Sequence, residues 1–154
     1  MTSVTHTTSS EDTRKFGHKL GRLLRGGDVV ELISDLGGGK TTLTQGIAEG
    51  LGYEEAVTSP TFTLSQIYQL ESGLEIHHYD LYRLSEGGVL GFELSEDIAA
   101  TNVITIVEWG DVVHGVLPEE RLRIKLTMDS EASREIEVSG SGDRSAEIIE
   151  ELKK

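Results

Sequence analysis

The chain has 154 residues, a formal net charge of −13 and no cysteine. Its length fits a single domain over residues 1–154, and the lack of cysteine excludes disulfides, thiolate metal sites and a cysteine nucleophile. No apolar run approaches the roughly 20 residues of a membrane span, and residues 1–10 lack the apolar core of a secretion signal. We therefore expect a cytoplasmic protein without membrane contact, in which residues 1–8 are disordered.

The first half of the chain predicts a helix, a strand and a second helix. Residues 11–24 have an amphipathic helical pattern, with Ser9 or Ser10 as the N-cap. The β-branched run 29–33 predicts a strand, and residues 41–51 predict a helix that begins after a glycine-rich segment. This order is half of a βαβ unit.

The middle of the chain predicts a hairpin followed by a weakly patterned stretch. Residues 61–70 and 74–84 are expected to be extended and joined by a turn at 71–73. Residues 87–100 have little periodicity, and we expect a helix only around 95–100.

The last third completes an α/β fold. The β-branched run 103–107 predicts a strand that is buried on both faces. Residues 121–128 and 134–138 alternate polar and apolar, which predicts an antiparallel pair, and 143–152 predict a closing helix. We expect a P-loop NTPase-like mixed sheet flanked by helices, with an antiparallel C-terminal strand pair and a nucleotide at the carboxyl ends of its central strands.

Acidic residues dominate the middle of the sequence. Between Thr41 and Glu120 there are fourteen Asp or Glu residues and one basic residue, Arg83. Such a surface repels a phosphate backbone, so we expect no stable binding of naked nucleic acid by this chain alone. The carboxylates either suit a basic partner surface or only aid solubility.

The glycine-rich segment 34–42 has the composition of a phosphate-binding loop. Backbone N–H groups of a glycine run can surround an anion, and the start of the following helix directs its positive end toward the same place. Lys40 adds an ammonium group, and Thr41 supplies a hydroxyl for Mg²⁺. Ser34 stands where the G-x-x-x-x-G-K-[ST] pattern has its first glycine. A plain glycine turn is the structural alternative, but it gives no reason for Lys-Thr-Thr at the helix start.

A carboxylate follows the strand predicted at 103–107. Glu108 is where an acid that holds Mg²⁺ or orients an attacking water is expected, with a helix cap or a salt bridge as the alternative. Trp109 is the only tryptophan. It either packs in the core or shields the phosphate site.

The segment 77–83 contains adjacent histidines and an aspartate. Period two predicts that His78, Asp80 and Tyr82 share one face of a strand. A zinc site needs three or four ligands, and the other histidines show no ligand spacing. Asp80 suits a second acid near Mg²⁺, or an N-cap.

A possible switch segment precedes the predicted hairpin. Ser59-Pro60-Thr61 lies where many phosphate-loop enzymes have such a segment, and the Thr61 hydroxyl is placed to sense a γ-phosphate. The same tripeptide is also an ordinary turn before a strand.

Taken together, four blocks resemble the bacterial TsaE (YjeE) family over nearly the whole chain. They are Asp35-Leu36-Gly37 with Gly39-Lys40-Thr41-Thr42, Ser59-Pro60-Thr61-Phe62-Thr63-Leu64, His78-Tyr79-Asp80-Leu81-Tyr82-Arg83-Leu84 and Val107-Glu108-Trp109. The resemblance implies an Mg²⁺-dependent ATPase required for tRNA N6-threonylcarbamoyladenosine (t6A) synthesis. Such a protein acts with TsaB and TsaD, is weak alone and stimulated by these partners, and meets tRNA only through their complex.

The resemblance also implies roles for individual residues. Lys40, Thr61, Asp80 and Glu108 would act in hydrolysis, and Thr41 with Glu108 would hold Mg²⁺. Thr13 and Arg134 are similar to family positions near the base. The phosphates of ATP would be held by Gly37, Gly38, Gly39, Lys40, Thr41 and Thr42. Ser34 and Gly38 replace the family's usual glycine and alanine.

Two other functions are open from the sequence. A non-catalytic module would bind ATP only to order a segment for a partner. A small-molecule kinase would need cationic groups to gather two phosphorylated substrates, and the middle of the chain offers one arginine.

Overall fold

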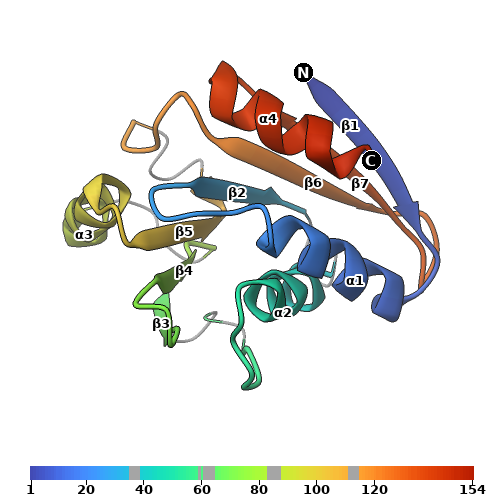
Figure 1. The fold of residues 1–154 in the computed structure, drawn as a ribbon, viewed down its shortest axis with the longest axis horizontal. Helices are drawn as coiled ribbons and strands as arrows, with labels where there is room; N and C mark the ends of the chain where they lie inside the picture. The colour runs from blue at the N-terminus through green and yellow to red at the C-terminus, as the bar shows by residue number, and fades with distance from the viewer. Residues whose placement is uncertain (35–38, 59, 61–64, 83–87, 111–114) are drawn as a thin grey trace.

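The computed structural model describes residues 1–34, 39–58, 60, 65–82, 88–110 and 115–154 (Figure 1). They form one seven-stranded sheet in the order β1-β7-β6-β2-β5-β4-β3. The strands are β1 (Thr2–Thr7), β2 (Val29–Ile33), β3 (Ser65–Gln69), β4 (Glu75–Asp80), β5 (Val103–Glu108), β6 (Leu122–Met128) and β7 (Arg134–Gly140). The helices are α1 (Ser10–Gly21), α2 (Lys40–Gly50), α3 (Gly88–Ala99) and α4 (Gly142–Leu152). In this part of the chain no helix has the length and apolarity to cross a bilayer.

The centre of the sheet is parallel and both edges are antiparallel. β2 lies between β5 and β6 and runs parallel to both, and β4 joins β5 in parallel. β3 closes one edge antiparallel to β4. At the other edge β7 pairs antiparallel with β6, and β1 pairs antiparallel with β7. The mixed α/β sheet and its antiparallel C-terminal strand pair are therefore as predicted. Because β2, β4, β5 and β6 run the same way, their carboxyl ends meet at one edge of the sheet.

Apolar side chains on the two faces of the sheet pack against different helices. Val30 of β2 belongs to a core cluster with residues of α1, α2 and α4, including Leu20 and Ile47. Its neighbour Val29 belongs to a second cluster with Leu94 of α3. Successive residues of a strand point to opposite faces, so three helices cover one face and α3 covers the other. All six residues of β5 are buried, as predicted for a strand covered on both sides.

Helices α1 and α2 lie side by side (Figure 1) and touch through glycines. A β-carbon on Gly17 would lie 2.5 Å from the carbonyl oxygen of Leu43 and 3.0 Å from the backbone nitrogen of Ile47. A β-carbon on Gly21 or Gly46 would also overlap backbone atoms of the facing helix. The helix that begins the candidate phosphate site is therefore fixed against α1 at backbone contact.

An ion pair adds to this helix contact. Arg14 of α1 donates through Nε to Oε2 of Glu49 of α2 at 2.9 Å, and through Nη2 to the other carboxylate oxygen. The hydrogen bonds from Arg14 lower the pKa of Glu49 below its ordinary value. A carboxyl with a lowered pKa stabilises the fold above its unfolded-state pKa, and this contribution is lost as the pH falls through the folded-state pKa.

The expectation that residues 1–8 are disordered is wrong. Thr2–Thr7 form β1 and pair with β7 from Thr2 with Ser139 to Thr7 with Arg134. Val4 is the only aliphatic residue in this strand and is exposed, so the pattern has no buried face to reveal it. Its threonines favour extended backbone, and pairing with β7 stabilises the strand.

The remaining element boundaries differ by smaller amounts. Ser9 is the N-cap of α1, because its Oγ accepts the N–H of Asp12 at 3.1 Å. The helix expected at 95–100 is longer, since α3 begins at Gly88. The predicted hairpin is present as β3 and β4, while residues 61–64 and 83–84 of its expected strands lie outside the described residues.

The glycine contact predicts that Gly17→Ala destabilises the protein. Alanine in a helix is normally favoured over glycine by roughly 0.5–1 kcal/mol, but here its methyl group meets fixed backbone, so we expect a net loss of about 1–3 kcal/mol. The measurement is the free energy of unfolding from a urea titration. Gly91→Ala in α3 is the matched control, since among the described residues its β-carbon would meet Val116 Cγ2 alone, at 3.7 Å. An equal effect of the two substitutions would contradict the account.

Candidate functional site

The amino end of α2 follows the carboxyl end of β2. Gly39 precedes the helix with φ of +99°, a conformation that glycine adopts without strain, and Lys40 is the first helical residue. The first turn of a helix has backbone N–H groups without intrahelical acceptors, and the helix dipole favours an anion there. Gly37 and Gly38 lie outside the described residues. The strand and helix on either side of the predicted phosphate loop are therefore present.

The Lys40 side chain turns back toward the end of the sheet. It is 8% exposed, and its Nζ donates to the carbonyl oxygen of Ser34 at 3.1 Å. The same Nζ lies 3.7 Å from Oε1 of Glu108 at the end of β5. A buried ammonium needs such partners because it has lost its water. The two charged residues predicted from separate motifs thus meet.

Two carboxylates stand side by side on neighbouring strands. Asp80 of β4 and Glu108 of β5 are register partners, and each is 4% exposed. Oδ1 of Asp80 accepts the backbone N–H of Tyr82 at 3.1 Å. Glu108 thus ends a strand as the sequence predicted, whereas Asp80, expected inside an extended segment at 74–84, ends β4 and lies beside it.

His78 holds the second carboxylate oxygen of Glu108. Its Nε2 lies 2.7 Å from Oε2 of Glu108, and the imidazole is 1% exposed. An ionised carboxylate only accepts hydrogen bonds, so Nε2 bears the hydrogen. Nδ1 is buried without a hydrogen-bond partner in the described part of the chain.

Trp109 covers Lys40. The Lys40 Nζ lies 5.1 Å from the centroid of the tryptophan ring, within range of a cation–π contact. Tyr82 packs against the same ring at a centroid distance of 4.9 Å. Trp109 has φ of +60°, which is a strained conformation for a bulky residue and is common at functional sites. It also packs on the second core cluster, so the two alternatives from the sequence are not exclusive.

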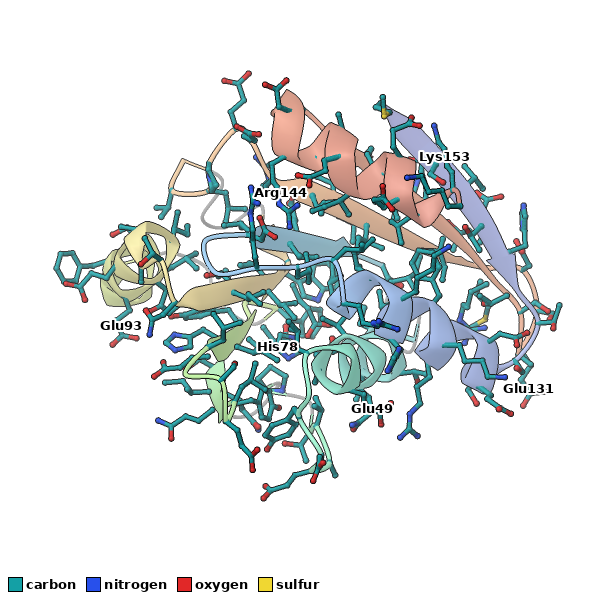
Figure 2. All side chains as sticks on the ribbon, in the orientation of Figure 1. Glu49, His78, Glu93, Glu131, Arg144 and Lys153 are labelled. Carbon is teal, nitrogen blue, oxygen red and sulfur yellow. The ribbon has the colours of Figure 1, made fainter. Side chains whose placement is uncertain are left out.

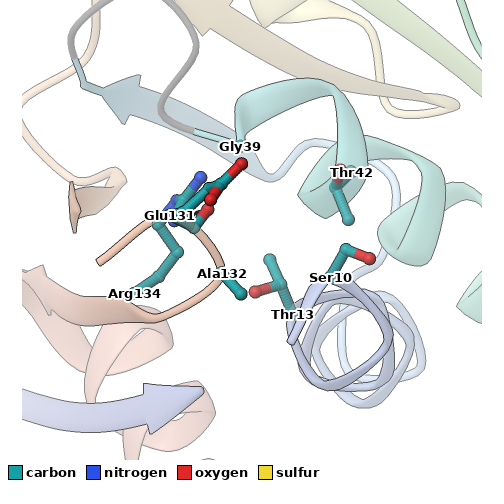
Figure 3. Close-up of a pocket in the computed structure, with 7 residues that line it drawn as sticks. All are labelled: Ser10, Thr13, Gly39, Thr42, Glu131, Ala132 and Arg134. Carbon is teal, nitrogen blue, oxygen red and sulfur yellow. Dashed lines mark hydrogen bonds between the residues drawn. The ribbon is translucent and has the colours of Figure 1, made fainter. Parts of the chain in front are cut away.

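A cavity of about 180 Å³ joins the start of α2 to the loop before β7 (Figure 3). It is lined by Ser10, Thr13, Gly39, Thr42, Glu131, Ala132 and Arg134. The Thr13 hydroxyl bonds with that of Thr7 at 2.8 Å, while Nη1 of Arg134 donates to three carbonyl oxygens of its own loop. The two residues expected near a base therefore lie together, beside the end of α2 expected to bind phosphate.

Thr41 faces a second, adjoining cavity. This cavity has about 370 Å³ and is lined by Ser10, Glu11, Arg14, Thr41, Thr42 and Gln45. Thr61 lies outside the described residues, so its predicted role stays a prediction.

The donor set suits Mg²⁺ bound together with phosphate. Mg²⁺ is usually held by one or two carboxylates, a hydroxyl and substrate phosphates rather than by a full protein cage. Glu108 and Asp80 offer carboxylate oxygens at the strand ends, and Thr41 offers a hydroxyl in the first turn of α2, where it lines the second cavity. The described residues contain no cluster of three or more His, Cys, Asp or Glu side chains suited to hold an ion by themselves. The residues present fit a nucleotide-bound Mg²⁺.

The two adjacent histidines serve different contacts. His77 lies on the opposite face from His78, with Nδ1 2.6 Å from Asp97 of α3 and Nε2 2.6 Å from Glu75. Tyr79 also bonds to Asp97, and burial, followed by this bond, raises the pKa of Tyr79. His77 thus ties β4 to α3, and the histidine pair does not converge on one point.

Part of the site was not predicted from the sequence. His78 was placed on the face of Asp80, but its bond to Glu108 was not predicted. The alternation along β4 and the parallel pairing with β5 were the available signals. Gln45 and Glu131, which line the cavities, had no motif to mark them.

Helix α2 is capped by a glycine and begins with a lysine, and acidic residues end two neighbouring parallel strands. These features define an α/β protein with a P-loop NTPase-like sheet. The model of the family described as threonylcarbamoyl adenosine biosynthesis protein TsaE matches residues 7–136. The chain belongs to the TsaE family, whose role is in t6A biosynthesis.

Individual relatives agree over most of the chain. The tRNA threonylcarbamoyladenosine biosynthesis protein TsaE of Streptomyces coelicolor is 41% identical over 136 residues, which cover 85% of this chain and 92% of that protein. The protein of the same name from Bacillus subtilis is 35% identical over 151 residues, or 95% and 90% of the two chains. The crystal structure of Bacillus subtilis YdiB superposes with a TM-score of 0.81 at 33% identity and covers 99% of this chain and 95% of that one.

The buried pair of His78 and Glu108 predicts an energetic coupling. His78→Ala leaves Glu108 with one donor fewer, so we expect a loss of about 1–3 kcal/mol in the free energy of unfolding. In a Glu108→Ala background we expect His78→Ala to lower the free energy of unfolding by about 1 kcal/mol less than in the wild type. The measurement is a double-mutant cycle by urea titration.

His6→Ala is the control for this cycle, because the His6 side chain is 64% exposed. We expect a change within about 0.5 kcal/mol. If the effects of His78→Ala and Glu108→Ala on the free energy of unfolding are strictly additive, the hydrogen bond between His78 and Glu108 is contradicted.

Proposed function

We propose that the protein binds ATP with Mg²⁺ at the carboxyl edge of its sheet and hydrolyses it slowly in support of t6A formation on tRNA. The observation that supports this most is the meeting of the Lys40 ammonium with Glu108 at the start of α2. Membership of the TsaE family supports the pathway.

Lys40 is the residue that changes partner in this proposal. In the structure its ammonium is held by the Ser34 carbonyl and Glu108. Phosphate oxygens would replace these contacts in part, while the N–H groups of the first turn of α2 would donate to the same anion. Gly37 to Thr42 would surround the phosphates, and Thr13 and Arg134 would border the base.

Glu108 and Thr41 would hold Mg²⁺, with Asp80 nearby. Bound Mg²⁺ would neutralise charge that develops on the transferred phosphoryl group. His78 fixes one carboxylate oxygen of Glu108, which leaves the other for the ion or for an attacking water. Asp80 and Thr61 would help to orient that water, and Trp109 would limit solvent access beside Lys40.

We further propose that the chain works with TsaB and TsaD in the cytoplasm and contacts tRNA only through that assembly. The net charge of −13 supports an indirect contact with tRNA, because an acidic surface repels tRNA phosphates and suits a basic protein surface.

The proposal predicts Lys40-dependent turnover. We expect slow ATP hydrolysis by the protein with Mg²⁺ and faster hydrolysis when TsaB and TsaD are added, measured as phosphate release. Lys40→Ala and Glu108→Gln should each lower the stimulated rate by about 100-fold or more. The first removes an ammonium that would stabilise charge on the phosphoryl group, and the second removes a carboxylate that would hold Mg²⁺. Lys15→Ala is the matched control, since that side chain is 71% exposed on α1.

Other outcomes would select another function. Equal turnover with and without TsaB and TsaD would count against the partnership. ATP binding without phosphate release, even with partners, would favour the non-catalytic module. A phosphorylated nucleoside or sugar would favour the kinase.

The position of Trp109 predicts an optical signal for binding. It is the only tryptophan and lies 5.1 Å from Lys40 Nζ. We expect Mg²⁺–ATP to change its fluorescence in the wild type, and this change to be lost in Lys40→Ala, because the ammonium beside the ring takes a new partner. The measurement is a fluorescence titration. Unchanged emission at nucleotide concentrations that saturate binding by calorimetry would contradict the placement.

A further inference from the structure

A polar stripe on α2 runs from the phosphate end of the helix toward its carboxyl end. Thr41, Gln45 and Glu49 are spaced by four residues and therefore share one face of the helix. Thr41 and Gln45 line the same cavity of about 370 Å³ with Arg14 of α1. Glu49, which projects from the outer side of α2 (Figure 2), binds Arg14. The proposed Mg²⁺ ligand thus lies one turn from Gln45.

The side-chain amide of Gln45 holds the backbone that follows α2. Its Oε1 accepts the N–H of Val57 at 2.7 Å. Its Nε2 lies 3.3 Å from the carbonyl oxygen of Glu55 and 3.3 Å from Oε1 of Glu49. A glutamine amide has two N–H donors, so these contacts use both donors and the oxygen. The position of Gln45 and that of residues 55–57 therefore depend on each other.

The same stretch of backbone is also held by β3. The N–H and carbonyl oxygen of Thr58 lie 3.3 and 3.0 Å from the hydroxyl of Tyr68. The Thr58 hydroxyl donates to Oε1 of Gln66 at 2.9 Å. Val57 itself is 7% exposed and belongs to the main core cluster. The chain directly before Ser59 is thus tied to α2 on one side and to β3 on the other.

We propose that Gln45 is a positioning residue that couples occupation of the phosphate end of α2 to the backbone of residues 55–58. This inference rests on the proposed function, because the occupant is the Mg²⁺–nucleotide. α2 is rigid over one turn, so a shift of Thr41 on ligand binding also shifts Gln45 and the groups bonded to its amide. Gln45 acts through this backbone, which leads to Thr61, and not on the reacting atoms.

The test is amide hydrogen exchange at Val57 and Thr58, followed by NMR with and without a non-hydrolysable ATP analogue and Mg²⁺. In the wild type we expect the analogue to slow exchange by at least about fivefold, the lower end of ordinary coupling between sites. In Gln45→Met, which keeps side-chain length and helix propensity, we expect less than about a twofold effect. The dissociation constant of the analogue should stay within about threefold of the wild-type value.

The turnover rate is a second measurement, and a purely structural role of Gln45 would not change it. We expect Gln45→Met to lower the partner-stimulated kcat by about tenfold, with KM for ATP within about threefold. Gln69→Met is the matched control, because Gln69 is exposed at the end of β3. It should resemble the wild type in both measurements.

The outcomes separate this inference from the function on which it rests. If the analogue binds the wild type but leaves exchange at Val57 and Thr58 unchanged, or protects them equally in Gln45→Met, the coupling is overturned and the proposed function stands. If the analogue does not bind the wild type, the proposed function is overturned and the coupling with it.

Discussion

The charges at the carboxyl edge of the sheet are removed from water, and the rest of the site depends on how they are paired. Lys40, His78, Asp80 and Glu108 are each less than 9% exposed. An unpaired charge in such a place is costly. The ammonium of Lys40 therefore lies beside one carboxylate oxygen of Glu108, and the imidazole of His78 bonds to the other. In the proposed function, phosphate would take over the contacts that Lys40 makes with a carbonyl oxygen and with a carboxylate 3.7 Å away.

Backbone packing determines where this edge lies relative to the cavities. The glycine contacts between α1 and α2 bring Thr13 within reach of the start of α2, so that one helix borders the proposed base site and the other the proposed phosphate site. Gln45 then connects α2 to residues 55–57. Both cavities are therefore lined by residues of α1 and of the first turns of α2.

Much of this arrangement could be predicted from local patterns. The run Val103–Val107 indicated a buried strand, and it placed Glu108 at the strand end where the structure has it. Parallel pairing then brings Asp80 beside Glu108. Contacts between distant polar residues had no such pattern: the bond from Gln45 to Val57 depends on how the chain returns after α2. β1 was missed because an edge strand with one exposed valine has no buried periodicity.

The central claim is that Lys40 binds nucleotide phosphate, and ligand-induced stabilisation tests it most directly. A ligand at 100 times its dissociation constant stabilises the folded state by about 2.7 kcal/mol, which raises the Tm of a chain of this size by roughly 5–10 °C. By calorimetry, Mg²⁺–ATP should give such a shift in the wild type, and Lys40→Met should lose most of it at the same nucleotide concentration. Equal shifts in both proteins, or no shift in the wild type, would contradict the account.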